Sequence, residues 1–246
     1  MSGETMNCPH CGKEICTKEE AEKVICFGAD MAFMSMYVSR GMTTNNDPVF
    51  EPNLWVSYKG FTASFWGNMD LTNYNGMSGN FNEVDYALDY SNSLDKLGYS
   101  AGFIYYTFPH TGDNDTAEFY AGLGYDVLLK PKLIVYYDFL QVDGFYGNFA
   151  ISHSFEVPEF SKAVKASFDL CAQVGMGSKN FNSFNFGCDH TSFSDMVFTA
   201  SLPVSISDYF TVKPTVSYST VLDRTIRTKN FKNDNVIWGA VLSASL

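Results

Sequence analysis

Three carboxylates share one face of a predicted strand over residues 81–90. Glu83, Asp85 and Asp89 alternate there with Val84, Tyr86, Leu88 and Tyr90, and a period of two is typical of a β-strand. Unpaired charges are rarely buried in a packed core, so we expect this face to meet water or cations. Carboxylates also bind Ca²⁺, but same-face residues on a strand lie about 7 Å apart, which disfavours one compact cage.

A second group of reactive side chains lies near the start of the chain. Cys8 and Cys11 form a Cys-x-x-Cys pair followed by Gly and Lys, a spacing that aims two thiolates at one zinc ion. A structural site needs a second pair at similar spacing, whereas Cys16 and Cys26 are ten residues apart. Three interpretations of residues 1–29 stay open: a zinc site formed by these four cysteines, a disulfide or redox role, and an incidental leader or tag.

The clearest strand pattern lies over residues 97–127. Two stretches there alternate between a continuously apolar face with aromatic ends and a face of small or charged residues. Strands of about ten residues with this pattern are typical of strands that cross a bilayer with the apolar face toward lipid. The same pattern predicts twelve strands, at 31–40, 50–58, 61–70, 81–90, 97–106, 117–127, 133–140, 145–155, 163–174, 191–202, 209–220 and 235–246.

Composition and charge narrow the class of protein further. Aromatic residues make up 16% of the chain and charged residues 17%, against about 25% charged residues in ordinary soluble domains. No run of 18 apolar residues exists, so a transmembrane helix is excluded. The net charge of −11 argues against a nucleic-acid partner. Residues 1–29 lack the apolar stretch of a signal peptide, which leaves open a processed or engineered form of an exported chain or a barrel outside the membrane.

The connections between the predicted strands alternate in length. Short turns follow the even-numbered strands and longer polar loops follow most odd-numbered ones, except near Asp143 and Gly144 after the seventh strand. An even strand number with short turns on one rim is typical of bacterial outer-membrane barrels, with both termini on the periplasmic side. We therefore predict an all-β fold, a closed antiparallel transmembrane β-barrel over residues 30–246, with residues 1–29 as a segment outside it.

Several short stretches resemble one known family. The stretches 37–41, 66–68, 83–85, 102–109 and 116–120 are similar to the TorF-type porin family of bacterial outer-membrane β-barrels. The resemblance covers about residues 30–246 and leaves the cysteine-containing segment uncovered. It implies an outer-membrane barrel with a transport role, inserted by the barrel-assembly machinery, and it carries no catalytic signature.

The inward faces of the predicted strands carry an excess of acids. The predicted pore-lining residues are Asp70, Glu83, Asp85, Asp89, Glu118, Asp126, Asp138 and Asp169, with the bases Lys165 and Lys213. A negatively lined pore concentrates cations and disfavours anions. The alternative is a plugged polar core, because a barrel of about twelve strands is narrow and its acids can pair with Arg40, Lys165 and Lys213.

Two other groups of residues concern catalysis and disulfide formation. Ser152, His153 and Ser154 are adjacent, but in a strand the imidazole points away from both hydroxyls, so a nucleophile–base pair is not expected. Cys171 and Cys188 lie near one loop, where an oxidising compartment favours a disulfide.

These observations together favour a non-enzymatic, porin-like channel in the bacterial outer membrane. We expect passive diffusion of small solutes with a preference for cations, and contact with membrane lipid but not with nucleic acid. Two alternatives stay open. One is a non-conducting structural or adhesive barrel that displays its loops at 175–190 and 221–234, and the other is a soluble ligand-binding barrel.

Overall fold

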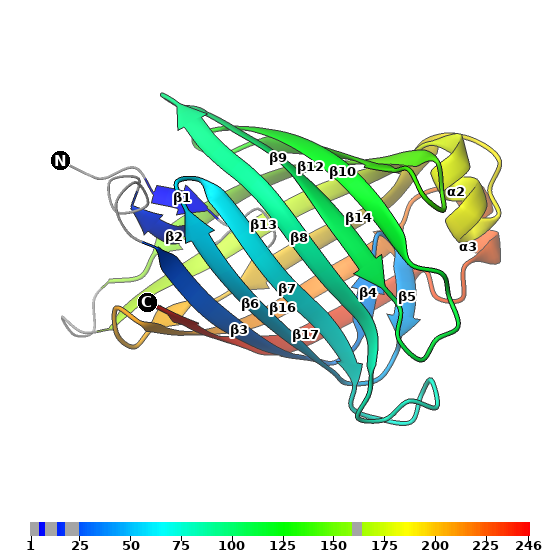
Figure 1. Ribbon diagram of the computed structural model, residues 1–246, viewed down its shortest axis with the longest axis horizontal. Helices are drawn as coiled ribbons and strands as arrows, with labels where there is room; N and C mark the ends of the chain where they lie inside the picture. The colour runs from blue at the N-terminus through cyan, green and yellow to red at the C-terminus, as the bar shows by residue number, and fades with distance from the viewer. Residues whose placement is uncertain (1–4, 8–13, 18–24, 159–163) are drawn as a thin grey trace.

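The computed structural model describes residues 5–7, 14–17, 25–158 and 164–246 (Figure 1). In this part of the chain, twelve antiparallel strands close into one barrel, as predicted. The pairing runs β12-β11-β10-β9-β8-β7-β6-β3-β17-β16-β14-β13, and β12 pairs with β13 to close it. The barrel strands are β3 (Cys26–Met34), β6 (Val49–Tyr58), β7 (Phe61–Asp70), β8 (Phe81–Leu94), β9 (Leu97–Thr107), β10 (Thr116–Tyr125), β11 (Lys132–Asp138), β12 (Gly144–Glu156), β13 (Lys165–Gly177), β14 (Ser192–Ser201) with its short continuation β15 (Val204–Ser205), β16 (Phe210–Val221) and β17 (Asp234–Ser245).

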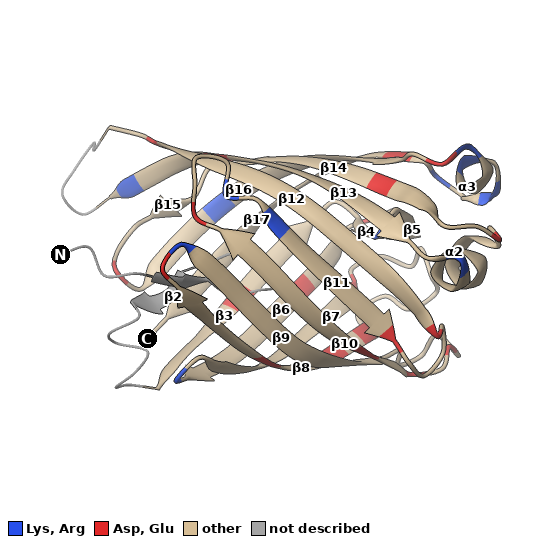
Figure 2. Ribbon diagram, turned by 90° about the horizontal axis from the view of Figure 1, so that it is seen from above, with Lys and Arg blue, Asp and Glu red and all other residues tan. Residues whose placement is uncertain are grey.

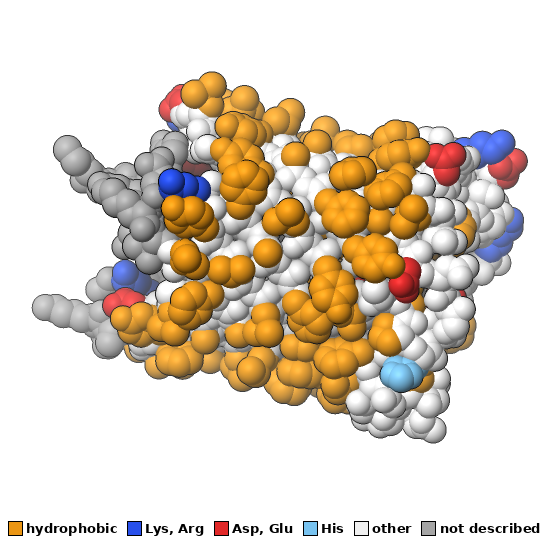
Figure 3. Space-filling model, in the orientation of Figure 1, with side chains coloured by type: hydrophobic (Ala, Val, Ile, Leu, Met, Phe, Trp, Pro, Cys, Tyr) orange, Lys and Arg blue, Asp and Glu red, His pale blue; other side chains and the backbone are white. Residues whose placement is uncertain are grey.

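The two faces of the barrel wall differ as the alternation predicts. Leu88, Leu123 and Trp238 point outward and are 55%, 55% and 64% exposed. Apolar side chains spread over the outer wall, and most charged side chains of this view lie toward the two ends (Figure 3). Polar residues such as Asn53 and Glu118 are buried on the inner face. The apolar band therefore faces the surroundings, and the polar core faces the lumen.

The two ends of the barrel are built differently. The end with the short turns after β6, β8 and β10, called here the turn rim, also holds the C-terminus (Figure 1). Lys59 and Gly60 both have positive φ there, which suits the two-residue turn between β6 and β7. The opposite end, the loop rim, carries the longer connections 71–80 and 108–115. The predicted division into short turns and long loops is present.

The first predicted strand, 31–40, has the wrong bounds. β3 begins at Cys26, inside the segment expected to lie outside the barrel, and ends at Met34. The chain then forms a separate hairpin from β4 (Tyr37–Ser39) and β5 (Met42–Asn45), called here the inner hairpin. Arg40 and Gly41 form its tip with φ of 49° and 84°, a conformation that glycine adopts without steric cost.

Two short helices occupy the loop rim, where only loops were expected. α2 (Lys179–Phe186) is N-capped by the Ser178 hydroxyl and ends at Gly187 in the left-handed conformation. α3 (Arg224–Lys229) is N-capped by the Asp223 carboxylate. Among the described residues, no helix is long and apolar enough to cross a membrane. The remaining strands, β1 (Thr5–Asn7) and β2 (Glu14–Thr17), pair with each other.

Candidate functional site

A cavity of about 1070 Å³ lies inside the barrel and extends to the loop rim. Side chains of β6, β7, β8, β9 and β10 line it, together with the inner hairpin. Seven acidic residues contribute to the lining, against the basic residues Arg40 and Lys213. Figure 2 shows acidic and basic positions along the barrel strands, and further basic positions on α2 and α3. The described lumen is therefore hollow and acidic.

The inner hairpin crosses the lumen from one wall to the other. It follows β3, and β11 lies six strands away from β3 in either direction around the barrel. The Arg40 guanidinium nevertheless lies 4.7 Å from the ring centre of Tyr136 on β11. On the way, the Tyr37 ring packs on Trp66 of β7 at 5.6 Å between centroids. The hairpin therefore narrows the lumen from inside.

Arg40 is held by an ion pair and by aromatic rings. Its two terminal nitrogens donate to the two carboxylate oxygens of Glu118 at 2.5 and 2.7 Å. The Tyr106 hydroxyl donates to the same carboxylate at 2.8 Å. Tyr146 provides a second ring at 4.7 Å from the guanidinium. This bidentate geometry and ring stacking suit arginine better than lysine and fix the hairpin tip against the far wall.

The acids of β6 and β8 form no such ion pair. Glu51 on β6 and Glu83 and Asp85 on β8 line the cavity. Within the described ranges, no lysine or arginine lies within ion-pair distance of these three carboxylates. One oxygen of Asp85 is buried without a hydrogen-bond partner among the described residues. The three carboxylates therefore form a negative patch without an ion pair of its own, called here the acidic wall.

The structure brings several predicted residues to this cavity. Besides Glu83 and Asp85, the predicted residues Glu118, Asp138 and Lys213 line it. Asp138 is engaged structurally, because it accepts hydrogen bonds from the Thr116 hydroxyl and from three backbone N–H groups of the following turn. Glu118 is neutralised by the arginine of the hairpin. Only part of the predicted acidic set therefore lines the cavity without such a structural partner.

Two predicted pore acids are buried in the wall. Asp70 is fully buried at the end of β7, where the side-chain amides of Asn45 and Asn82 donate to it at 2.6 Å. Asp89 is buried on the inner face of β8, and both its oxygens lack a hydrogen-bond partner among the described residues. Neither contributes to the cavity lining.

Three other predicted pore residues lie away from the cavity. Asp126 lies in the exposed turn after β10, so its assignment to the pore is corrected. Lys165 is exposed at the turn-rim end of β13, and Asp169 on the same strand accepts a hydrogen bond from the Ser154 hydroxyl. Glu51 was not among the predicted residues. The signal is nevertheless in the sequence, because Glu51 lies on the same face of its strand as Val49, Asn53 and Trp55, at a spacing of two residues.

The structure bears differently on the six cysteines that the sequence singled out. Cys8 and Cys11 lie outside the described residues, and Cys16 belongs to β2. Cys26 is buried in β3, so it belongs to the barrel wall. Cys171 and Cys188 are both free thiols, and the disulfide expected between them is absent. Cys188 instead lies near His190, a contact that sequence reasoning did not identify.

The Ser-His-Ser stretch on β12 does not form a nucleophile–base pair in the described structure. The His153 imidazole forms a hydrogen bond with the Leu128 carbonyl at 2.9 Å and packs edge-on against Phe155. Ser154 donates to Asp169 instead. These contacts agree with the expectation that the imidazole and the hydroxyls point to opposite faces.

The fold defines the class of protein as a closed twelve-stranded antiparallel β-barrel, and solved structures share this fold. The NanC porin matches with a TM-score of 0.50 and 12% identity over 89% of this chain and 100% of that chain. LpxR from Salmonella typhimurium matches with a TM-score of 0.51 and 6% identity over 89% and 99%. An outer membrane channel from Pseudomonas putida F1 has a TM-score of 0.44 and 7% identity over 90% and 94%.

No protein-family model matches the sequence, and no curated protein matches it. The resemblance to TorF-type porins therefore stays a prediction. At identities this low, the similarity to solved structures concerns the fold alone.

Proposed function

We propose that this protein is a porin-like channel of a bacterial outer membrane that lets small solutes diffuse and favours cations. The observation that carries the proposal is the acidic wall, Glu51, Glu83 and Asp85, which lines a hollow lumen and forms no ion pair with a lysine or arginine among the described residues. Fixed carboxylates raise the local concentration of cations and repel anions. The inner hairpin sets the width of the passage, and catalysis is not part of the proposal.

The outer surface supports a membrane location. Leu54, Phe61 and Phe119 are more than half exposed on the barrel wall. Contact of this apolar band with water would be unfavourable, whereas contact with lipid is not. A closed barrel satisfies its backbone hydrogen bonds without free strand edges, as hydrocarbon requires. Membrane lipid is therefore the expected partner of this band, and the barrel-assembly machinery is expected to insert it.

Single-channel recording in a planar bilayer with a salt gradient tests the proposal. We expect discrete conductance steps and a reversal potential that favours cations. Insertion without conductance would contradict the channel and support a structural barrel. A protein that stays folded in plain buffer and does not insert would contradict the membrane location as well.

A non-conducting structural barrel is the second candidate. It is favoured by one observation, the inner hairpin that crosses the lumen and is anchored on the far wall by Arg40 and Glu118. In this case the acidic wall would only solvate a closed polar core. The same recording separates the two candidates, because the structural barrel inserts without conducting.

The membrane location also predicts a large effect of a charge on the apolar band. Leu88→Arg, at the middle of β8, is expected to lower the free energy of unfolding by about 2–4 kcal/mol, because a charged side chain at the bilayer midplane is costly. Denaturant titration in lipid vesicles, followed by tryptophan fluorescence, measures it. Leu128→Arg is the matched control: Leu128 is 74% exposed in a turn at the turn rim, where the cost is about 0–1 kcal/mol. Equal effects of both substitutions would contradict the assignment.

A further inference from the structure

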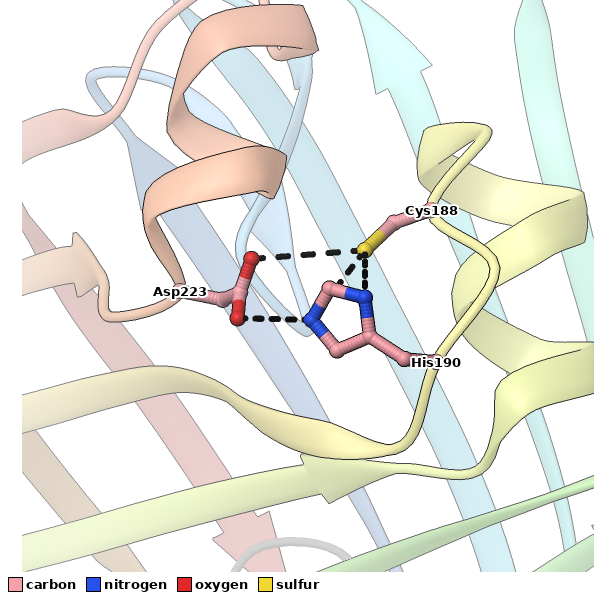
Figure 4. Close-up of side chains that lie close together, drawn as sticks. All are labelled: Cys188, His190 and Asp223. Carbon is pink, nitrogen blue, oxygen red and sulfur yellow. Dashed lines mark hydrogen bonds and ion pairs between the residues drawn. The ribbon is translucent and has the colours of Figure 1, made fainter.

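A thiol, an imidazole and a carboxylate meet at the loop rim (Figure 4). The Cys188 Sγ lies 3.6 Å from His190 Nε2, and the same nitrogen lies 3.0 Å from Asp223 Oδ2. The Cys188 Sγ also lies 4.0 Å from the other oxygen of this carboxylate, Asp223 Oδ1. One donor atom from each of the three residues therefore lies within 4.8 Å of the other two.

The backbone holds each of these side chains in place. Cys188 directly follows Gly187, whose left-handed conformation ends α2. The side-chain amide of Asn182 donates to the His190 carbonyl at 2.9 Å and fixes the loop between the two ligands. Asp223 uses Oδ1 to cap the first N–H groups of α3, so Oδ2 stays directed at the imidazole. The cluster is therefore preorganised rather than assembled from mobile side chains.

The chemistry of the three donors identifies the class of ligand. Thiolate, imidazole and carboxylate are the donors that zinc uses, with bonds of about 2.0–2.3 Å, whereas Ca²⁺ and Mg²⁺ take oxygen alone. In a tetrahedral site with such bonds, neighbouring donors are separated by roughly 3.3–3.8 Å. The distances from His190 Nε2 to Asp223 Oδ2 and to Cys188 Sγ, 3.0 and 3.6 Å, lie close to this range, so small side-chain rotations suffice.

We propose that Cys188, His190 and Asp223 bind a zinc-type divalent transition-metal ion, with a fourth coordination position open to solvent. The His190 side chain is 47% exposed, which gives the ion a path from outside, whereas Cys188 is fully buried. Binding replaces the thiol proton and the hydrogen bond between His190 and Asp223 with bonds to the metal. Zinc sites with three protein ligands and an open position are a common arrangement.

The proposed ion would join the end of α2 to the start of α3. Both helices contact the inner hairpin: Phe181 of α2 lies under the Arg40 guanidinium, and Asn230 after α3 donates to the Gly41 carbonyl at 3.0 Å. The same helices form an apolar cluster that contains Phe186, Cys188 and Ile226. An ion at this position would therefore stiffen the support of the constriction.

The competing explanation is that Cys188 is an ordinary buried residue of the apolar cluster beside a His190–Asp223 ion pair. Co²⁺ titration of the full-length protein, folded in detergent, separates the two explanations, because a thiolate bound to Co²⁺ gives an intense near-ultraviolet charge-transfer band. All samples carry Cys8→Ser, Cys11→Ser and Cys16→Ser, because these cysteines would compete for the ion. Displacement by Zn²⁺ then gives the zinc affinity.

We expect one equivalent of Co²⁺ with the charge-transfer band and its displacement by Zn²⁺. Cys188→Ser should abolish the band and weaken zinc binding by at least about 100-fold, beyond the 10–100-fold typical of supporting residues. Asp223→Asn keeps an acceptor that caps α3 but loses the anionic ligand, so it should weaken binding without unfolding the rim.

Cys171→Ser is the matched control, because Cys171 is a free thiol on β13 outside the cluster. It should leave both band and affinity unchanged. Absence of a stoichiometric band in the parent, or a band that persists in Cys188→Ser, would overturn the proposal. Far-ultraviolet circular dichroism of each variant checks that the barrel is folded.

Discussion

Replacing Glu51, Glu83 and Asp85 together with Gln, Gln and Asn will shift the reversal potential of the channel toward that of an unselective pore. These three carboxylates line the cavity and form no ion pair with a lysine or arginine among the described residues. In the proposed channel, the patch would therefore be a fixed negative charge along the path of an ion. We expect the cation-to-anion permeability ratio to fall by about tenfold, the lower end of the range for charge-lined clefts.

The effect of the triple substitution should depend on salt. The Debye length is about 10 Å at 0.1 M and 3 Å at 1 M, so the difference should shrink at high ionic strength. Asp126→Asn is the matched control, because Asp126 carries the same charge but lies in the exposed turn after β10. If the triple variant had the same reversal potential as the parent, the acidic wall would not determine the ion selectivity.

Removing the hairpin anchor should have the second large effect. Arg40→Ala takes away the guanidinium that is paired with Glu118 and stacked between Tyr136 and Tyr146. The substitution leaves the buried Glu118 carboxylate without its counter-ion. Loss of one partner of such a pair lowers the free energy of unfolding by about 3–5 kcal/mol. We also expect a larger conductance and stronger cation preference, because the hairpin tip is released and one positive charge leaves the lumen.

The double variant Arg40→Met with Glu118→Gln tests the physical reason. It removes both charges, so no unpaired carboxylate stays buried. The free energy of unfolding should therefore be higher than in Arg40→Ala and close to that of the parent, while the conductance stays high. Denaturant titration and single-channel recording on the same preparations measure both effects. Unchanged conductance in both variants would show that the hairpin is not the constriction.

Much of the barrel follows from local alternation. The acids of β8 were placed on the lumen side because Glu83 and Asp85 alternate with apolar residues, and the structure agrees. The inner hairpin does not follow from such a pattern. Its residues continue to alternate after β3, and the partners that pull it inward are distant: Glu118 is 78 residues from Arg40.

The loop rim shows the same limit. α2 has a sequence rich in Asn and Ser that is typical of a loop, and its helix is stabilised by the Ser178 cap and by burial of Phe181 and Phe186. The spacing of Cys188 and His190 is visible in the sequence, but Asp223 is 33 residues from the imidazole that it contacts. Only the closed barrel brings these segments together.

The position of the inner hairpin also has a consequence for barrel assembly. Arg40 follows the first strand, yet its contacts lie on β10, β11, β12 and α2, which are made later in synthesis. A flat, open sheet keeps β3 far from β11, and only full curvature places them face to face. The ion pair between Arg40 and Glu118 therefore forms only in the closed ring, and it stabilises the closed barrel relative to an open sheet.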